Sequence, residues 1–341
     1  MPGSILLTGG CGYIGSHIAT RLLAAGEDVV LFDNLSNSDA GVASRIAAIC
    51  GRAPAFVEGD VRDRSALDRV LASRRFGAVI HLAGLKSIAQ GEAEPLKYHD
   101  NNVEGSRTLL AAMDAAGVQA IVFSSSATVY GTPAPAAAAA GCREDMHPAP
   151  VNIYGRTKLA VEDMLRARQQ AQPELRAAVL RYFNPAGAHE SGLIGEAPAT
   201  DCGNLMPQMA QVALGRRARL RIFGNDYPTP DGTALRDYIH VEDLAAGHLA
   251  ALAALRRGTA AMTVNLGSGQ PRSVLEMVAA YQEASGRRIP HEMAARRPGD
   301  LPAYHADPGL ARKLLGWQAR HGIGRICRDA WRRELACASS A

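Results

Sequence analysis

The sequence predicts an α/β fold, in which a doubly wound parallel sheet is followed by a smaller α/β lobe at the C-terminal end. Apolar segments of strand length alternate with segments of helical length through the first half of the chain, as expected for a parallel sheet covered by helices on both faces. After about Asn184 this alternation is lost, and glycine and proline become more frequent. We therefore expect a first domain over residues 1–184 and a second lobe over residues 185–341, with some of the chain crossing back.

The individual elements follow from the same pattern. Strands are expected at 4–8, 29–33, 55–58, 78–82, 120–125 and 177–182, and helices at 13–23, 65–74, 103–116 and 154–172. In the second lobe we expect a helix over 205–215, a strand over 219–223 and a helix over 241–257. The alanine-rich stretch 132–142 has low complexity, and we expect it to form a surface loop without chemistry.

The first expected strand runs into three glycines spaced by three, Gly9, Gly12 and Gly15. Gly9 allows a tight turn from strand to helix, Gly12 lets a pyrophosphate approach the main chain, and Gly15 lets the helix pack closely on the strand. The N-terminus of the following helix then faces the phosphates with its N–H groups. A purely structural turn would explain the glycines alone, so the dinucleotide interpretation also needs support from the second expected strand.

The second expected strand ends at Asp33, eighteen positions after Gly15. An acidic side chain at this point of a Rossmann-type domain can bind the ribose hydroxyls of the adenosine, and it would repel a 2′-phosphate. The pattern therefore predicts NAD, rather than NADP, as the cofactor of the first domain.

A candidate catalytic group lies near the start of the helix at 154–172. Tyr154 and Lys158 are four positions apart and share a helix face. A tyrosine ionises near pH ~10, and a close ammonium together with a nicotinamide cation could bring this to roughly 7, which would make it a general base. Taken singly, a Tyr-x-x-x-Lys pattern is more often an amphipathic helix with a surface lysine. Ser126 favours the catalytic interpretation, because it follows an apolar strand at the same end of the sheet as the glycines.

Composition excludes several other classes of protein. The formal net charge is +4, and the short basic groups are not interleaved with aromatic residues, so we expect no nucleic-acid partner. The six cysteines form no C-x-x-C pair and no cluster with histidine, so we expect neither a metal site nor a disulfide framework. Nowhere do eighteen apolar residues follow one another, and we expect a cytoplasmic protein without a membrane segment.

These motifs, taken together, resemble the extended short-chain dehydrogenase/reductases, and within them the UDP-glucose 4-epimerase family. The resemblance covers essentially the whole chain. It rests on T-G-G-C-G-Y-I-G at 8–15, on H-L-A-G-L-K at 81–86, on S-S-S-A-T-V-Y-G at 124–131, on Tyr154-x-x-x-Lys158, and on R-Y-F-N-P-A-G-A-H at 181–189. Further matches are N-L-M-P at 204–207, I-F-G-N-D-Y-P-T at 222–229, R-D-Y-I-H-V at 236–241 and R-P-G-D-L-P-A-Y at 297–304.

The resemblance assigns roles to individual positions. It implies that NAD is bound by Gly9, Gly12, Tyr13, Ile14, Gly15, Asp33, Asn34, Asn37, Ser38, Asp60, Val61, Ala83, Lys86, Asn101, Tyr154, Lys158 and Tyr182. It implies that the UDP-sugar is bound by Lys86, Ser126, Tyr154, Phe183, Asn184, Asn204, Leu205, Ile222, Phe223, Arg236, Tyr238, Arg297, Asp300 and Tyr304. The implied catalytic residues are Tyr154, Lys158 and Ser126.

The implied activity is the interconversion of UDP-galactose and UDP-glucose through a transient 4-keto sugar, with NAD tightly bound, in a homodimer formed by the helices at 103–116 and 154–172. Ala127 and Thr128 stand where related dehydratases carry an acidic pair, so dehydration is not expected. Tyr304 is bulky where relatives that accept N-acetylated sugars have a smaller residue, which implies a preference for UDP-glucose and UDP-galactose. The alternatives are an epimerase of uronic, pentose or N-acetylhexosamine UDP-sugars, and an NAD-sensing binding protein without catalysis.

Overall fold

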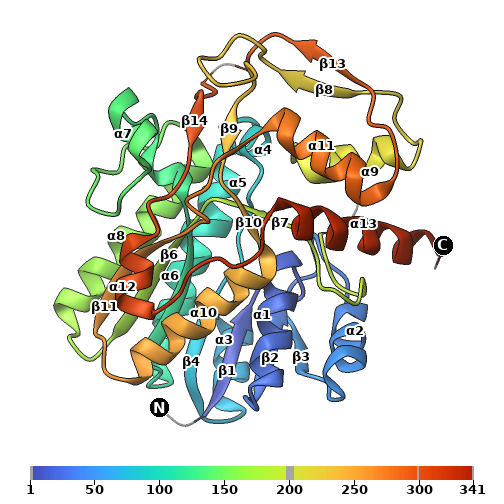
Figure 1. Cartoon of the computed structure of the whole chain (residues 1–341). Helices are drawn as coiled ribbons and strands as arrows, with labels where there is room; N and C mark the ends of the chain where they lie inside the picture. The colour runs from blue at the N-terminus through green and yellow to red at the C-terminus, as the bar shows by residue number, and fades with distance from the viewer. Residues whose placement is uncertain (1–2, 197–202, 298, 340–341) are drawn as a thin grey trace.

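A seven-stranded sheet forms the centre of the computed structural model, which describes residues 3–196, 203–297 and 299–339 (Figure 1). Its strand order is β11-β6-β5-β4-β1-β2-β3, and every neighbouring pair is parallel. The strands are β1 (Ser4–Thr8), β2 (Val29–Asp33), β3 (Ala55–Glu58), β4 (Phe76–His81), β5 (Ala120–Ser126), β6 (Arg176–Tyr182) and β11 (Ala261–Leu266). From β1 the chain winds outward in both directions, so the predicted doubly wound sheet is confirmed, and ligands of such sheets bind where the order reverses, between β1 and β4.

Helices cover both faces of this sheet, because the apolar strands present alternate residues to each side. The face that contains Ile5 and Leu7 packs against α1 (Tyr13–Ala24), α2 (Gly41–Cys50), α10 (Val241–Arg256) and α12 (Gly309–Leu315). The face that contains Leu6 packs against α3 (Arg64–Ala72), α6 (Gly105–Ala115) and α8 (Ile153–Ala171). Shorter elements lie in the connections: α4 (Ile88–Ala93), α5 (Pro95–His99), the π-helix η1 (Asp100–Glu104), the 3-10 helix η2 (Ala127–Tyr130) and α7 (Pro135–Ala140).

The second lobe has its own core, in which Met209, Tyr281 and Ile326 are fully buried. Its helices are α9 (Leu205–Ala213), α11 (Val274–Ser285) and α13 (Ile323–Ser339), and its strands are β7 (Asn184–Ala186), β8 (Leu220–Phe223), β9 (Leu235–Arg236), β10 (Tyr238–His240), β12 (Arg272–Ser273), β13 (His291–Ala294) and β14 (Ala303–Tyr304). These strands form three small sheets, β10-β7, β12-β9-β14 and β13-β8. Figure 1 shows β8, β13, α9 and α11 grouped together away from the central sheet.

The chain crosses back to the first domain after entering the second lobe. Helix α10 packs on α1, and β11 extends the central sheet beyond β6. The sequence predictions include α10 but not β11, because its sequence A-M-T-V-N-L is short and lies in the half of the chain where the alternation is lost. A boundary at residue 184 stays a prediction, since elements on both sides of it contribute to one sheet.

Two predictions, for the stretch 132–142 and for the helix at 103–116, differ from the structure. The stretch 132–142 is not simply a loop, because residues 135–140 form α7. Alanine has the highest helix propensity, and a proline at the first helical position is already close to helical geometry. The helix expected at 103–116 begins instead as the π-helix η1, which becomes regular at Gly105.

The described residues form neither a metal site nor a membrane-spanning helix. No group of three or more His, Cys, Asp or Glu side chains among them is placed to hold a metal ion. Five cysteines have free thiols, namely Cys11, Cys50, Cys142, Cys327 and Cys337, whereas Cys202 lies outside the described residues. Within the same ranges, no helix is both long and apolar enough to cross a membrane.

Candidate active site

The glycine loop joins β1 to α1 and has the close packing that its sequence predicts. Gly9 has φ +70°, and a Cβ at this position would lie 2.7 Å from the backbone nitrogen of Ala83. A Cβ at Gly15 would lie 2.3 Å from the Gly9 carbonyl oxygen, so only glycine fits where the helix meets the turn. Gly12 is more open, since its nearest such contact is 3.3 Å, and no side chain caps the helix that starts after it. A helix N-terminus of this kind fits a phosphate group.

Asp33 lies at the end of β2 and connects the glycine loop to the following loop. Its carboxylate accepts hydrogen bonds from the Cys11 backbone N–H (2.9 Å), the Leu35 N–H (2.9 Å) and the Ser38 hydroxyl (3.0 Å). A carboxylate has about four acceptor positions, so one remains for a ribose hydroxyl. The expected ribose contact therefore fits this geometry, with the donors on the protein fixing the orientation of the carboxylate.

Several other residues expected to bind NAD follow β2 and β3. Asn34 donates to the Asp60 carboxylate at 2.9 Å, and Arg62 also binds Asp60, which holds the pKa of that carboxyl far below its usual value. Asn37 is exposed in the loop after β2, and the Val61 side chain is buried. The structure thus joins Asn34 and Asp60 at the carboxyl ends of β2 and β3.

The loop after β4 is fixed by Asn102, a residue that the sequence reasoning did not single out. Its side chain accepts a hydrogen bond from the Leu85 N–H (2.8 Å) and donates to the Leu85 carbonyl (3.0 Å) and to Thr157 on α8 (3.0 Å). Its neighbour Asn101 donates to Asn102. Because α8 also contains the candidate base, Asn102 sets the loop of Ala83 and Lys86 relative to the candidate catalytic residues. Asn101 was identified by resemblance, and an Asn-Asn pair in a helix could have pointed to its neighbour.

Helix α8 brings the three candidate catalytic residues together. Asn152 caps the helix by accepting a hydrogen bond from the Gly155 N–H at 2.8 Å, and Gly155 packs so closely on the Thr128 carbonyl that a Cβ there would lie 2.8 Å from it. The Lys158 ammonium donates to the Ser124 carbonyl at 2.7 Å and lies 5.8 Å from the centre of the Tyr154 ring. The helix is therefore seated against the end of β5, where Ser126 lies.

Ser126 is oriented by a second residue that the sequence reasoning missed. Its hydroxyl oxygen accepts hydrogen bonds from the backbone N–H of Thr128 (3.2 Å) and from the Thr128 hydroxyl (3.0 Å). With its acceptor positions used in this way, the Ser126 O–H is left to donate, and its hydrogen bond to Tyr154 lowers the pKa of that phenol. A threonine two positions after a serine at a strand end is a recognisable ST-type signal.

The groups of the chain alone do not give the Tyr154 phenol the pKa of roughly 7 that is expected beside the nicotinamide cation. Burial raises the pKa of Tyr154 to about 12, although the Ser126 hydrogen bond opposes the rise. Burial also lowers the pKa of Lys158 to about 8. The chain alone therefore does not produce a tyrosine that ionises near neutral pH, because the effect of burial exceeds that of the Ser126 hydrogen bond. A further positive charge next to the phenol is required.

Tyr182 is the last residue of β6, and Phe183 follows it. The Tyr182 hydroxyl is bonded to His248 of α10 in the interior, and burial raises its pKa well above the usual value. The Phe183 ring packs against the Tyr304 ring, with 5.7 Å between centroids. The Tyr304 hydroxyl donates to the Ala127 carbonyl. Tyr304 of the second lobe thus lies next to the residue that follows Ser126.

The second lobe places two arginines around one carboxylate. The Asp300 side chain binds Arg297 (2.8 Å) and Arg236 (3.3 Å), and the Arg297 guanidinium lies 5.0 Å from the centre of the Phe223 ring. The remaining predicted substrate residues lie on neighbouring elements: Asn184 on β7, Asn204 and Leu205 at the start of α9, Ile222 on β8 and Tyr238 on β10. Planar cations fixed in this way suit a diphosphate.

Contacts between the two lobes bring these sets of residues together. The Tyr13 hydroxyl donates to the Gly187 carbonyl at 2.6 Å. Lys86 and Asn204 both bind the carboxylate of Glu196, a further residue that was not predicted. The structure therefore assembles the glycine loop, the Ser126–Tyr154–Lys158 group and the arginine cluster around the carboxyl end of the sheet.

Comparison with known proteins identifies the class. A model of the NAD dependent epimerase/dehydratase family matches residues 5–267. The chain is 50% identical to a UDP-glucose 4-epimerase of Bacillus subtilis (strain 168) over 329 residues, which is 96% of each protein. The chain belongs to the NAD dependent epimerase/dehydratase family, which confirms the expected class of enzyme, its fold and its NAD dependence.

Two solved structures are similar over nearly the full length. The UDP-glucose 4-epimerase of Stenotrophomonas maltophila, with bound NAD and formylated UDP-arabinopyranose, has a TM-score of 0.96 and 46% identity, covering 100% of both chains. That of Bifidobacterium longum, in complex with NAD+ and UDP, has a TM-score of 0.93 and 41% identity, covering 99% of this chain and 100% of the other. Both resemble this chain in both lobes.

Proposed function

We propose that the protein is a UDP-glucose 4-epimerase that interconverts UDP-galactose and UDP-glucose through a 4-keto sugar. The observation that carries this proposal is the position of Ser126 and Tyr154 between a glycine loop that fits NAD and a pair of arginines that suits a diphosphate. The full-length relatives named UDP-glucose 4-epimerase support the same choice.

The fit to NAD rests on this chain's own geometry. The glycine loop leaves its open side at Gly12, and Asp33 keeps an acceptor position for a ribose hydroxyl. When bound, NAD supplies reversible hydride acceptance at C4 of the sugar, so oxidation and reduction cancel over one turnover. Its oxidised ring also has the positive charge that the Tyr154 phenol needs, since the chain by itself raises the pKa of Tyr154.

The proposed roles of the catalytic residues follow from their contacts. Tyr154 takes the proton of the sugar 4-hydroxyl during oxidation and returns it during reduction. When the substrate binds, the Ser126 O–H turns from Tyr154 to the sugar 4-oxygen and donates to it, because Thr128 occupies the acceptor positions of Ser126. Lys158 remains fixed by the Ser124 carbonyl and stabilises the phenolate by its charge. No net proton or electron is consumed.

The second lobe holds the part of the substrate that does not react. Arg236, Arg297 and Asp300 would bind the diphosphate and ribose, while the sugar turns over about its linkage between the two half-reactions. The nucleotide must be bound tightly and the sugar loosely, because first one face and then the other face of the 4-keto group must be turned toward the nicotinamide.

The experiment supplies UDP-galactose to the purified protein without added NAD and measures UDP-glucose in quenched samples by chromatography. We expect turnover by the NAD that the protein retains. Product that appears only after NAD is added would indicate the same reaction with a loosely held cofactor. If no UDP-glucose forms with or without added NAD, the proposal is contradicted.

A Tyr154→Phe variant tests the proposed base. It should retain NAD and lose roughly a hundredfold to ten-thousandfold in kcat. Activity close to that of the parent protein would remove Tyr154 from this role. A panel of UDP-glucuronate, UDP-xylose and UDP-N-acetylglucosamine separates the alternative epimerases, and NAD binding without turnover of any UDP-sugar would indicate an NAD-sensing protein.

We further propose a cytoplasmic homodimer. Three large apolar side chains are exposed on or beside the elements that pack against α8, namely Ile88 on α4, Leu96 on α5 and Val151 before α8, and Leu96 is 84% exposed. Such a group supports an interface that includes α8. Light scattering should give a mass near twice the 36.0 kDa of the chain, and a mass equal to one chain would contradict the dimer.

A further inference from the structure

We propose that Glu196 is a positioning residue that holds Lys86 of the first domain and Asn204 of the second lobe in a fixed relation across the active site. The Glu196 carboxylate oxygen Oε1 accepts a hydrogen bond from the Lys86 ammonium at 3.3 Å and from the Asn204 amide at 2.8 Å. Since both partners are expected to touch the ligands, this inference rests on the proposed function.

The two partners come from different lobes, and Glu196 bonds to both of them. Lys86 lies after β4, and its side chain is 57% exposed, so its four-carbon stem is free to move without an anion next to it. Asn204 is the residue at which α9 begins, but its side chain does not cap that helix. One carboxylate, itself only 15% exposed, satisfies both and joins the cofactor side of the site to the nucleotide side.

Glu196 can do this because the loop before it is held firmly. Residues Ala188 and Gly195 form an isolated antiparallel bridge, and a Cβ at Gly195 would lie 2.9 Å from both Ala188 and Arg333. From α13, Arg332 donates to the Glu190 carbonyl at 2.6 Å, and Arg333 donates to the Gly192 and Leu193 carbonyls at 3.2 Å and 3.1 Å. The C-terminal helix therefore sets where Glu196 lies.

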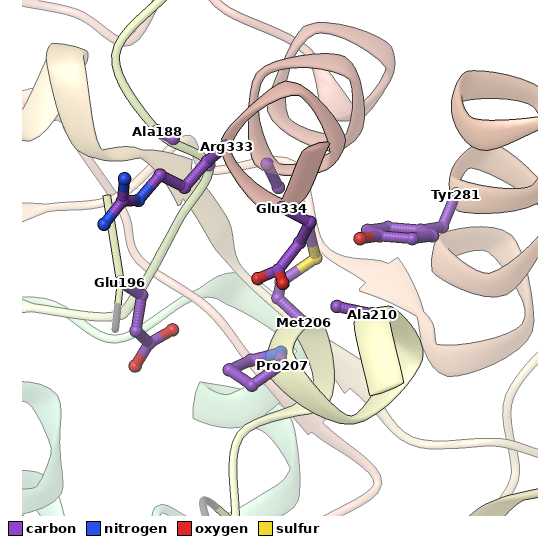
Figure 2. Close-up of a pocket in the computed structure, with 10 residues that line it drawn as sticks. Ala188, Glu196, Met206, Pro207, Ala210, Tyr281, Arg333 and Glu334 are labelled. Atoms are coloured by element: carbon purple, nitrogen blue, oxygen red, sulfur yellow. The ribbon is translucent and has the colours of Figure 1, made fainter. Parts of the chain in front are cut away.

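A small cavity lies behind Glu196 and completes this support. Figure 2 shows Glu196 and Arg333 on one side of it and Tyr281 on the other, with Glu334 of α13 and Met206 and Pro207 of α9 between them. Its volume is about 20 Å³, enough for one water molecule. The Tyr281 hydroxyl, Glu334 Oε2 and Arg333 Nε are buried there without a hydrogen-bond partner among the residues that the structure describes, so the cavity is polar and fits a bridging water between α13 and α11.

The test compares two substitutions that remove different parts of the arrangement. Glu196→Gln loses the charge next to Lys86 but keeps an acceptor for Asn204, whereas Glu196→Ala loses both. We expect the KM for UDP-galactose to rise about threefold to tenfold in Glu196→Gln and more in Glu196→Ala, with a smaller change in kcat. Glu190→Gln is the matched control, since Glu190 belongs to the same loop and forms an exposed pair with Arg325, and its KM should stay within about twofold.

A double-mutant cycle shows whether Glu196 acts through Lys86. In a Lys86→Met background, Glu196→Gln should have no further effect on KM, because its partner is already gone. An equal rise in KM in both backgrounds would overturn the inference, and so would variants of Glu196 that behave like Glu190→Gln.

Binding measurements keep this inference separate from the proposed function. Calorimetry with UDP on the NAD-containing protein should show weaker binding for Glu196→Ala and nearly unchanged binding for Glu196→Gln, whatever the turnover. Absence of turnover in the parent protein would overturn the proposed function, whereas equal UDP affinity in the parent protein and Glu196→Ala would overturn the role of Glu196.

Discussion

Lys158 is fixed by a hydrogen bond of 2.7 Å from its ammonium to the backbone carbonyl of Ser124, on the strand that ends at Ser126. The side chain of this helical lysine therefore also contacts the sheet, and its ammonium lies 5.8 Å from the centre of the Tyr154 ring. The carbonyl satisfies one of the three donors of the ammonium, while burial penalises the charged form.

This relationship predicts a decline of activity at alkaline pH. Burial lowers the pKa of Lys158 to about 8, so the lysine is charged below that pH and loses its proton as the pH rises through it. Because the phenolate of Tyr154 depends on this charge, kcat should fall on the alkaline side with an apparent pKa near 8. Lys158→Arg should lack this decline, since arginine stays protonated. A pH profile of kcat in which both proteins decline together would contradict the prediction.

Gly15→Ala should greatly weaken the binding of NAD. The new Cβ would lie 2.3 Å from the Gly9 carbonyl oxygen, and the turn must shift to make room. We expect purified Gly15→Ala to contain less than about a tenth of the NAD of the parent protein, as measured by extraction and absorbance, because the phosphate-binding geometry depends on this turn. Gly322→Ala is the control, since nothing lies within 4 Å of a Cβ there, and its NAD content should not change.

Tyr304→Ser should change the choice of substrate. The tyrosine ring packs against Phe183, and its hydroxyl binds the Ala127 carbonyl, so its removal opens space next to Ser126. We expect kcat/KM for UDP-N-acetylglucosamine to rise at least tenfold relative to that for UDP-galactose, since a pocket that gains room for an added group shifts discrimination by about this factor. An unchanged ratio of the two values would show that Tyr304 does not limit the size of the sugar.

Buried histidines should make the protein sensitive to acid. Burial lowers the pKa of His17 and His81 to about 3 and that of His248 to about 4. Their unfolded pKa is about 6.5, so between these values the unfolded chain binds more protons than the folded one, and stability falls as the pH drops below about 6.5. Each histidine contributes up to about 1.4 kcal/mol per pH unit.

Urea unfolding at pH 7.5, 6.5 and 5.5 measures this slope. His81→Gln should lower the stability at neutral pH but reduce the loss on acidification. His147→Gln is the control, since His147 is exposed, and it should keep the slope of the parent protein. A stability that does not change between pH 6.5 and 5.5 would contradict the prediction.

The sequence was sufficient for six of the seven strands of the central sheet and for the glycine loop. Strand runs such as Ile5–Leu7 are apolar on both faces, and the spacing of Gly9, Gly12 and Gly15 indicates a dinucleotide loop once Asp33 is found at the end of the next strand, so both were predictable. The placement of Tyr154 and Lys158 on one helix face was predictable for the same reason, since it depends only on local geometry.

The remaining features depend on contacts between distant residues. Asn102, Thr128 and Glu196 are polar residues whose roles appear only when the loop after β4, η2 and the loop before α9 come together. Burial of Tyr154, which raises its pKa in the chain without NAD, depends on packing that no local pattern encodes, and the pKa near 7 expected beside the nicotinamide cation stays a prediction. Strand β11 was missed because six residues with a weak pattern become a strand only beside β6.

The return of β11 to the central sheet has a consequence for how the molecule can be divided. A fragment that ends at residue 184 would present β6 as an open strand edge, with its N–H and C=O groups unpaired along the register that β11 occupies. It would also expose the apolar surface of α1 on which α10 packs. Open edges of this kind pair with other chains, so the excised fragment should self-associate, and the nucleotide-binding half cannot be handled as an independent module.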